Sequence, residues 1–214
     1  MANGILSGTG ERSDPYLIED AKDLDYIRNM SSSHKIFKLA KDIDMNVEPY
    51  NTGKGWTPMT VFNGVLDGDG HAIKHLYIND PELENAGLFS DLYLDSITQV
   101  ANLALLDVNI IAKNNVGAIA GEIIKTDDKT AYYQKQSIIS VCYVTGKISA
   151  RNNAGSLVGA CEKMEGISYN PTLDINTKKY SCPGVNDCHS DVDLTIKGDN
   201  CGGLFGVLSL DDKY

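Results

Sequence analysis

Three side chains with acid–base or metal-binding chemistry share one glycine-rich stretch. Asp67, Asp69 and His71 alternate there with Gly68 and Gly70. Carboxylates and an imidazole at this spacing are the groups that a calcium site or an acid/base pair would use. The remaining ligands of an EF-hand loop are missing, and Asp and Gly are ordinary residues of tight turns. We therefore predict a turn here.

Two pairs of aspartates alternate with apolar residues. Asp42 and Asp44 form the first pair and Asp191 and Asp193 the second, so each pair occupies one face of an expected strand. Pointing outward, they are solvated side chains. Glycosidase chemistry would need a second carboxylate facing them across a cleft, and the sequence does not place one.

The histidines show no catalytic arrangement. They are scattered along the chain, at His34, His71, His75 and His189. Neither a Gly-x-Ser-x-Gly elbow nor a His-Glu-x-x-His zinc signature occurs. We predict no catalytic residues and a protein that is not an enzyme.

Five cysteines leave an odd number and form no Cys-x-x-Cys pair. Cys182 and Cys188 lie six positions apart, and His189 follows Cys188, so a zinc site is one interpretation. Structural zinc ligands, however, usually come in pairs two to four residues apart. We favour small buried thiols and a loop disulfide, whose pairing between Cys182 and Cys188 stays open. No metal and no cofactor is predicted. The other three cysteines of the chain are Cys142, Cys161 and Cys201.

A repeated corner predicts the fold that must position these groups. From Asn85 onward, Asn-x-Gly occurs four times, each time before a short apolar stretch that often holds a second glycine. A polar corner followed by a short strand is what a stacked β-solenoid requires, because every coil turns at the same place. We expect Leu103, Val144 and Leu157 to be buried in it. The predicted turn residues are Asn85, Gly87, Asn115, Gly117, Asn153, Gly155, Asn200 and Gly202.

The corners are unequally spaced, at 30, 38 and 47 residues. We assign the excess to loop insertions at about 125–136 and 162–187, which are polar and end before the next apolar segment. Residues 1–36 are predicted to form an N-terminal cap and residues 37–214 the β-helix. Within the cap, Asp20 is the expected N-cap of a short helix that buries Leu24 and Ile27.

Composition narrows the class of protein. Of 214 residues, 42% are apolar, which argues against disorder. A net charge of −10 opposes unspecific binding to nucleic acid. We find no apolar window long enough for a membrane span and no signal peptide, and we expect neither.

Several motifs follow one another in the N-terminal part of the chain: Gly8-Thr9-Gly10, residues 14–18, residues 39–45, Trp56-x-Pro58 and residues 62–71. Together they resemble the start of right-handed parallel β-helix proteins with GLUG repeats, and the glycine-rich corners resemble the GLUG repeat itself. The resemblance covers nearly the whole chain. It implies an all-β, right-handed parallel β-helix (solenoid) with a short N-terminal capping helix, of a kind found in bacterial adhesins, beside the catalytic part of some secreted peptidases, and in phage virion proteins.

Tyrosines in the two insertions are candidate ligand-binding residues. Tyr132 and Tyr133 lie in the first, and Tyr169 and Tyr180 in the second. Exposed tyrosine suits contact with glycan or protein. The alternative is that these rings pack down and fasten the loops to the flank of the β-helix.

The function predicted from the sequence is a non-enzymatic phage virion protein, structural or adhesive, that attaches to the particle or binds a bacterial surface component. A polysaccharide-degrading β-helix enzyme and a bacterial surface adhesin module are the alternatives. The C-terminal coil, with apolar side chains along its edge, is expected to contact other virion proteins or copies of itself. The expected location is the virion, or alternatively the bacterial cell surface.

Overall fold

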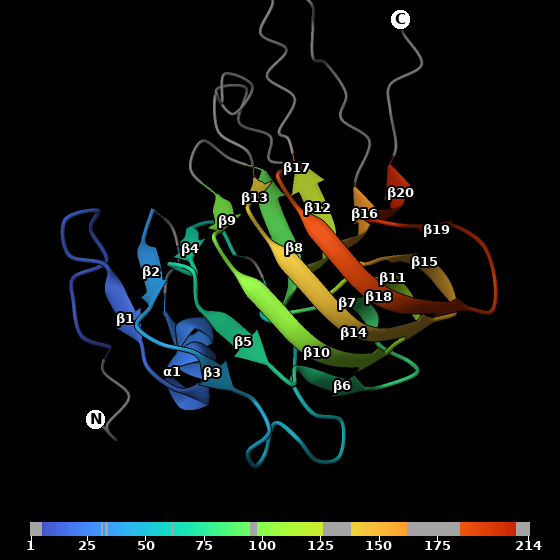
Figure 1. Ribbon diagram of the computed structural model, residues 1–214, viewed down its shortest axis with the longest axis horizontal. Helices are drawn as coiled ribbons and strands as arrows, with labels where there is room; N and C mark the ends of the chain where they lie inside the picture. The colour runs from blue at the N-terminus through green and yellow to red at the C-terminus, as the bar shows by residue number, and fades with distance from the viewer. Residues whose placement is uncertain are drawn as a thin grey trace, which may run out of the picture.

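A computed structural model describes residues 6–30, 32, 34–60, 62–94, 98–125, 138–161 and 185–208. It is a right-handed parallel β-helix with one short helix at its N-terminal end, as predicted (Figure 1). From Val65 onward the chain visits four parallel sheets in a fixed order and then repeats the circuit. Each strand therefore pairs with its equivalents in the coils before and after it.

The first sheet is made of very short strands. Its outermost member, β1, lies within the predicted cap and pairs in parallel with β2. The strands, in spatial order, are β1 (Tyr16–Ile18), β2 (Ile36–Leu39), β4 (Val65–Asp67), β9 (Gln99–Ala101), β13 (Ile139–Ser140) and β17 (Val185–Asn186).

The second sheet holds the longest strands, which run side by side across the front of Figure 1. Two short strands of one coil, β5 and β6, pair with the single long strand β10 of the next. The members are β3 (Ile43–Asp44), β5 (Ala72–Lys74), β6 (Tyr77–Asn79), β10 (Ala104–Ile111), β14 (Tyr143–Ala150) and β18 (His189–Ile196).

Two four-stranded sheets complete each coil. The third sheet carries the predicted Asn-x-Gly corners and comprises β7 (Glu84–Ala86), β11 (Asn114–Val116), β15 (Asn152–Gly155) and β19 (Cys201–Gly202). The fourth comprises β8 (Phe89–Leu94), β12 (Ala120–Lys125), β16 (Val158–Cys161) and β20 (Phe205–Leu208).

The asparagines of the corners form a hydrogen-bonded ladder along the β-helix. Asn85, Asn115, Asn153 and Asn200, the ladder asparagines, all have left-handed backbones with φ between 51° and 67°. Each side-chain amide donates to the side-chain oxygen of the asparagine one coil earlier, at 2.8 Å in all three steps. The bonded residues are 30, 38 and 47 positions apart, so each unequal interval in the sequence is one coil.

The glycines of the repeat are required by close approach, since none of the corner glycines has a positive φ. A Cβ on Gly117 would lie 2.5 Å from the carbonyl oxygen of Leu157 in the next coil. A Cβ on Gly159, the second glycine of its repeat, would lie 2.1 Å from the backbone of Asn115. The left-handed residue of each corner is thus the asparagine, and glycine lets neighbouring coils approach.

The interior is a continuous apolar column. Leu103, Val144 and Leu157 are at most 2% exposed, which confirms their predicted burial. Aromatic rings fill the N-terminal half: the Phe62 and Phe89 ring centroids are 4.5 Å apart, and those of Phe37 and Phe62 are 6.0 Å apart. Side chains that repeat at the same coil position therefore stack on one another.

The N-terminal end is closed by helix α1 (Ala21–Tyr26), a following 3-10 turn (Ile27–Asn29) and the loop before β4. Asp20 caps α1 as predicted, accepting from the backbone N–H groups of Lys22 and Asp23 at 2.8 and 2.9 Å. Leu24 is fully buried in the core. In the loop, the Trp56 indole donates to the Leu88 carbonyl at 3.0 Å.

The predicted insertions at about 125–136 and 162–187 connect β12 to β13 and β16 to β17, and lie almost entirely outside the described residues. Both join the fourth sheet to the first. The corresponding connection from β8 to β9 spans only residues 95–98.

Removal of a ladder side chain tests the corner. We expect Asn115→Ala to lower the free energy of unfolding by about 2–4 kcal/mol, because it loses two ladder bonds and places Ala in a left-handed backbone. Asn115→Gly also loses the ladder bonds, but glycine adopts the left-handed conformation readily, so the free energy of unfolding should fall by less, about 1–2 kcal/mol. Chemical denaturation measures both.

The control is Asn109→Ala, at an exposed position of β10, which should change the free energy of unfolding by about 0.5 kcal/mol or less. Equal stability of Asn115→Ala and this control would contradict a stabilising ladder.

Candidate binding surface

The glycine-rich stretch is a turn, as predicted. Asp69 has a φ of 51°, and the backbone N–H of His71 donates to the Gly68 carbonyl at 2.8 Å. Asp67 accepts from the Asp69 backbone N–H at 2.9 Å, and Asp69 pairs with Lys38 at 2.9 Å. These carboxylates shape the turn.

Asp42 and Asp44 lie on the exposed side of the second sheet, and each contacts a basic side chain. Asp42 contacts Lys74 at 2.7 Å and accepts from the Ala72 backbone N–H at 3.0 Å. These two hydrogen bonds hold the pKa of the Asp42 carboxyl below its usual range. Asp44 contacts His75 at 2.7 Å, which lowers the pKa of the Asp44 carboxyl in the same way.

Asp191 and Asp193 are exposed on the outer face of β18, while the residues that alternate with them point toward the core. Among the described residues, no group of three or more His, Cys, Asp or Glu side chains is arranged to hold a metal ion. The four candidate tyrosines, Tyr132, Tyr133, Tyr169 and Tyr180, lie outside the described residues.

Two carboxylates that the sequence did not single out meet at the start of the ladder. Asp91 and Glu122 occupy equivalent positions on β8 and β12. Both accept from the side-chain amide of Asn85, at 2.9 and 3.1 Å. Asn85 has no ladder asparagine before it, and these two carboxylates accept its amide hydrogens instead. They therefore cap the first step of the ladder.

A second ladder runs beside the first. Asn152 donates to Asn114 at 2.9 Å, and Asn114 donates to the Glu84 carboxylate at 3.2 Å. Glu84 also pairs with Lys113 at 2.8 Å, and this contact is the main reason that the pKa of the Glu84 carboxyl is lowered. Both ladders therefore end on carboxylates toward the N-terminus.

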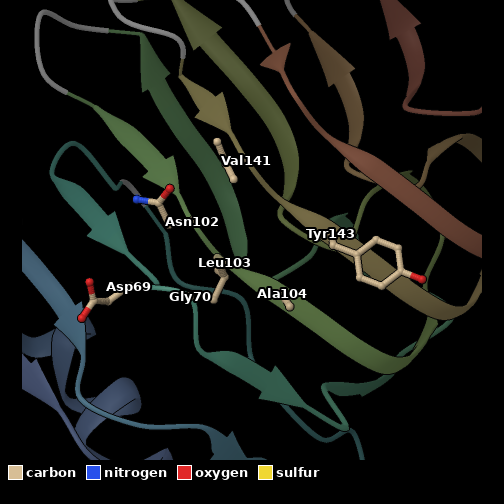
Figure 2. Close-up of a pocket in the computed structure, with 7 residues that line it drawn as sticks. All are labelled: Asp69, Gly70, Asn102, Leu103, Ala104, Val141 and Tyr143. Carbon is tan, nitrogen blue, oxygen red and sulfur yellow. The ribbon is translucent and has the colours of Figure 1, made fainter.

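An open hollow of about 350 Å³ lies where the first sheet turns into the second. Figure 2 shows its wall rising over three successive coils, with the Tyr143 ring projecting from the ribbon. Val141 and Tyr143 are 54% and 41% exposed, whereas Leu103 is buried at the base. The hollow is lined by Asp69, Gly70, Asn102, Leu103, Ala104, Val141 and Tyr143.

Val141 holds an unfavourable backbone conformation at this corner. Its φ is 52°, in the left-handed region that β-branched residues rarely adopt. The equivalent positions in the neighbouring coils are Asn102 and Asp187, with φ of 53° in both, and these residue types tolerate it. Strained backbone is concentrated at functional sites, which directs attention to Val141.

The polar residues at the rim of the hollow, Asn102 and Asp69, are held in place by contacts outside the hollow. The Asn102 side chain donates to Asp67 at 2.9 Å, one coil earlier. Together with the pairing of Asp69 and Lys38, this contact fixes the positions of an amide oxygen and a carboxylate beside the exposed apolar pair. An apolar surface with a few fixed polar groups is typical of a ligand site.

Sequence reasoning missed this hollow because its residues lie about 30 to 40 positions apart and follow no motif. Residues 98–105 and 138–144 are mostly apolar in sequence, yet each stretch contains a left-handed corner, at Asn102 and at Val141. One signal was available: the polar Asn102 within an apolar stretch marks the corner, and Val141 occupies the equivalent position in the next coil.

No family model matches the chain, so the resemblance to GLUG-repeat proteins stays a prediction. The chain is 28% identical to halomucin from Haloquadratum walsbyi over 81% of its own length and 2% of halomucin. It is 32% identical to a candidate Gly-rich membrane protein from Evansella cellulosilytica over 55% of its own length and 14% of that protein. The chain thus spans a small part of both relatives.

One solved structure shares the fold. A candidate immunoglobulin A1 protease from Bacteroides ovatus superimposes with a TM-score of 0.60 at 18% identity, covering 96% of this chain and 65% of that one. At this identity the likeness shows the architecture alone. Within the described part of this chain, no helix has the length and apolar character needed to cross a membrane.

The contacts of Asp42 with Lys74 and of Asp44 with His75 predict a response to acid. A carboxyl whose pKa is lower in the folded than in the unfolded chain stabilises the fold above its unfolded pKa, and that contribution is lost as pH falls through the folded pKa. We expect Asp42→Asn with Asp44→Asn to lower the thermal midpoint by about 1–3 °C near pH 6. The difference from the wild type should vanish below about pH 3.

Thermal melts across this pH range measure the effect. Asp193→Asn, at an exposed aspartate on the same sheet, is the matched control and should melt as the wild type does near pH 6. A constant deficit of the double variant down to the lowest pH would show that charge is not its cause.

Proposed function

We propose that this chain is a non-enzymatic β-helix module of a surface protein, and that it binds a glycan of a cell surface through the hollow beside Tyr143. The observation that carries the proposal is the exposed pair Val141 and Tyr143 next to fixed polar groups, on a backbone strained at Val141. An aromatic ring with a polar tip and adjacent hydrogen-bonding groups matches the alternating apolar and hydroxyl faces of a sugar.

The charge of the protein narrows the ligand class. The net charge is −10, and the one charged residue of the hollow's lining is Asp69. A polyanionic glycan would be repelled by this surface. We therefore propose a neutral or amino-sugar oligosaccharide.

The non-enzymatic proposal is supported by the same lining. Glycoside hydrolysis ordinarily uses two carboxyl groups placed on either side of the scissile bond. Among the described lining residues Asp69 supplies the single carboxylate, and it is engaged with Lys38. The other described aspartates of the predicted sites are in turns, ion pairs or the outer face of β18.

The surface location is supported by the relatives. One is named as a membrane protein, and the chain spans 14% of it and 2% of the other, as a module of a larger protein would. The virion location stays a prediction, since neither name refers to a virus.

Binding to an array of neutral, amino-sugar and acidic bacterial glycans tests the function. We expect neutral or amino-sugar ligands to bind, with no release of reducing sugar. Tyr143→Ala should weaken binding at least about 10-fold, the equivalent of about 1.4 kcal/mol. Ile111→Ala, at an exposed apolar residue on the outer face of β10, is the control and should bind as the wild type does.

Val141→Asn gives a sharper test, because it should raise stability by relieving the left-handed valine while it weakens binding by removing apolar contact. Binding of all glycans that is unchanged in both Tyr143→Ala and Val141→Asn would contradict the proposed site. Release of sugar by the wild type would contradict the proposed lack of activity.

We propose further that the last described coil contacts another chain or a further coil. Leu194 pairs in register with Ile148, and Phe205 with Val158. Ile148 and Val158 are at most 1% exposed, but Leu194 and Phe205 are only half-buried. Open strand edges beside apolar side chains favour association.

Light scattering at increasing protein concentration tests this contact. We expect self-association that Leu194→Lys prevents, because the charge would enter the apolar column. Thr195→Lys, at the adjacent outward position of β18, should associate as the wild type does. Circular dichroism checks that both variants fold, and a wild type that stays monomeric would contradict association between copies.

A further inference from the structure

Two cysteines meet at equivalent positions of neighbouring coils. Cys142 and Cys188 directly precede β14 and β18, whose first residues, Tyr143 and His189, are in register. The backbone N–H of His189 donates to the Cys142 carbonyl at 2.9 Å. The two cysteines are therefore held one above the other by the parallel pairing of their strands.

The two thiol sulfurs occupy equivalent positions of neighbouring coils. The Cys142 sulfur lies 3.3 Å from the carbonyl oxygen of Ser140, and the Cys188 sulfur lies 3.2 Å from that of Asn186, the equivalent atom one coil later. Each thiol also shifts the pKa of the other. Paired strands are about 4.8 Å apart, and disulfides span Cα separations of roughly 4.4–6.8 Å.

The two thiols differ in access to solvent. Cys142 is 2% exposed, while Cys188 is half-buried. The interaction with the Cys142 thiol also lowers the pKa of the Cys188 thiol to about 7, and the interaction with Cys188, together with burial, raises the pKa of Cys142. Because the thiolate is the nucleophile in disulfide exchange, Cys188 is the residue that reacts first.

We propose that Cys142 and Cys188 are a reactive dithiol that a low-molecular-weight disulfide oxidises to an intramolecular bond, fastening the coil of β18 to that of β14. The Cys188 thiolate attacks one sulfur of the reagent, whose S–S bond breaks and releases one thiol. Cys142 then loses its proton, attacks the Cys188 sulfur and expels the second thiol. Two protein thiols are oxidised, and one reagent disulfide is reduced to two thiols.

The bond would also brace the proposed binding hollow. Cys142 lies between Val141 and Tyr143, the two exposed apolar residues of its wall. The cross-link would restrain the strained corner without occupying the hollow, since Cys142 points into the core. The dithiol rests on the register of β14 and β18 and does not depend on the hollow's function.

Incubation with oxidised glutathione, followed by digestion and mass spectrometry, tests the proposal. We expect a peptide linked through Cys142 and Cys188, the loss of two free thiols, and a rise in the thermal midpoint of about 5 °C or more, since the bond closes a long loop. Cys142→Ser should stop at the mixed disulfide, leaving one glutathione on Cys188 and no cross-link.

Two controls address the other cysteines. The double variant Cys161→Ser with Cys201→Ser should still form the bond, as these residues lie on β16 and β19. Cys182→Ser should also form it, although Cys182 lies outside the described residues. A cross-link from Cys188 to Cys182, a wild type that stops at the mixed disulfide, or no reaction would each overturn the proposal.

Discussion

The amide-to-amide hydrogen bond between asparagines of successive coils is the constraint on which the other features depend. It satisfies a polar side chain at a corner where the backbone is left-handed, and it does so in the same direction in every coil. The N–H end of the ladder meets Asp91 and Glu122, so its terminal donor makes charge-assisted bonds. The parallel second ladder ends on Glu84 by the same logic.

Once these corners are fixed, the direction of every neighbouring side chain follows. Strand residues alternate between the apolar column and the solvent, which is why the aspartates of β18 are exposed while their neighbours point inward. The corner between the first and second sheets lacks a continuous ladder, because Val141 stands between Asn102 and Asp187. The hollow lies at this corner, where the Asn102 side chain donates a hydrogen bond to Asp67 and not to an asparagine of the neighbouring coil.

Much of the fold was predictable, because the Asn-x-Gly corners recur in the sequence and short-range signals such as Asp20 mark the capping helix. The burial of Leu103, Val144 and Leu157 was predicted from the stacked solenoid that these corners imply, and the structure confirms it. The candidate site was not predictable in the same way. Tyr143 and Asn102 become neighbours only through the register of coils, and the proximity of Cys142 to Cys188 needs the strand pairing between β14 and β18.

The hydrogen bonds of the ladder can be observed one by one in solution. Trans-hydrogen-bond couplings in the NMR spectrum of labelled protein, from each asparagine side-chain nitrogen to the side-chain carbonyl carbon of the asparagine one coil earlier, would trace the ladder directly. We expect couplings from Asn115 to Asn85, from Asn153 to Asn115 and from Asn200 to Asn153, with slow exchange of these amide protons. Rapidly exchanging side-chain amides without couplings would contradict a structure organised by this ladder.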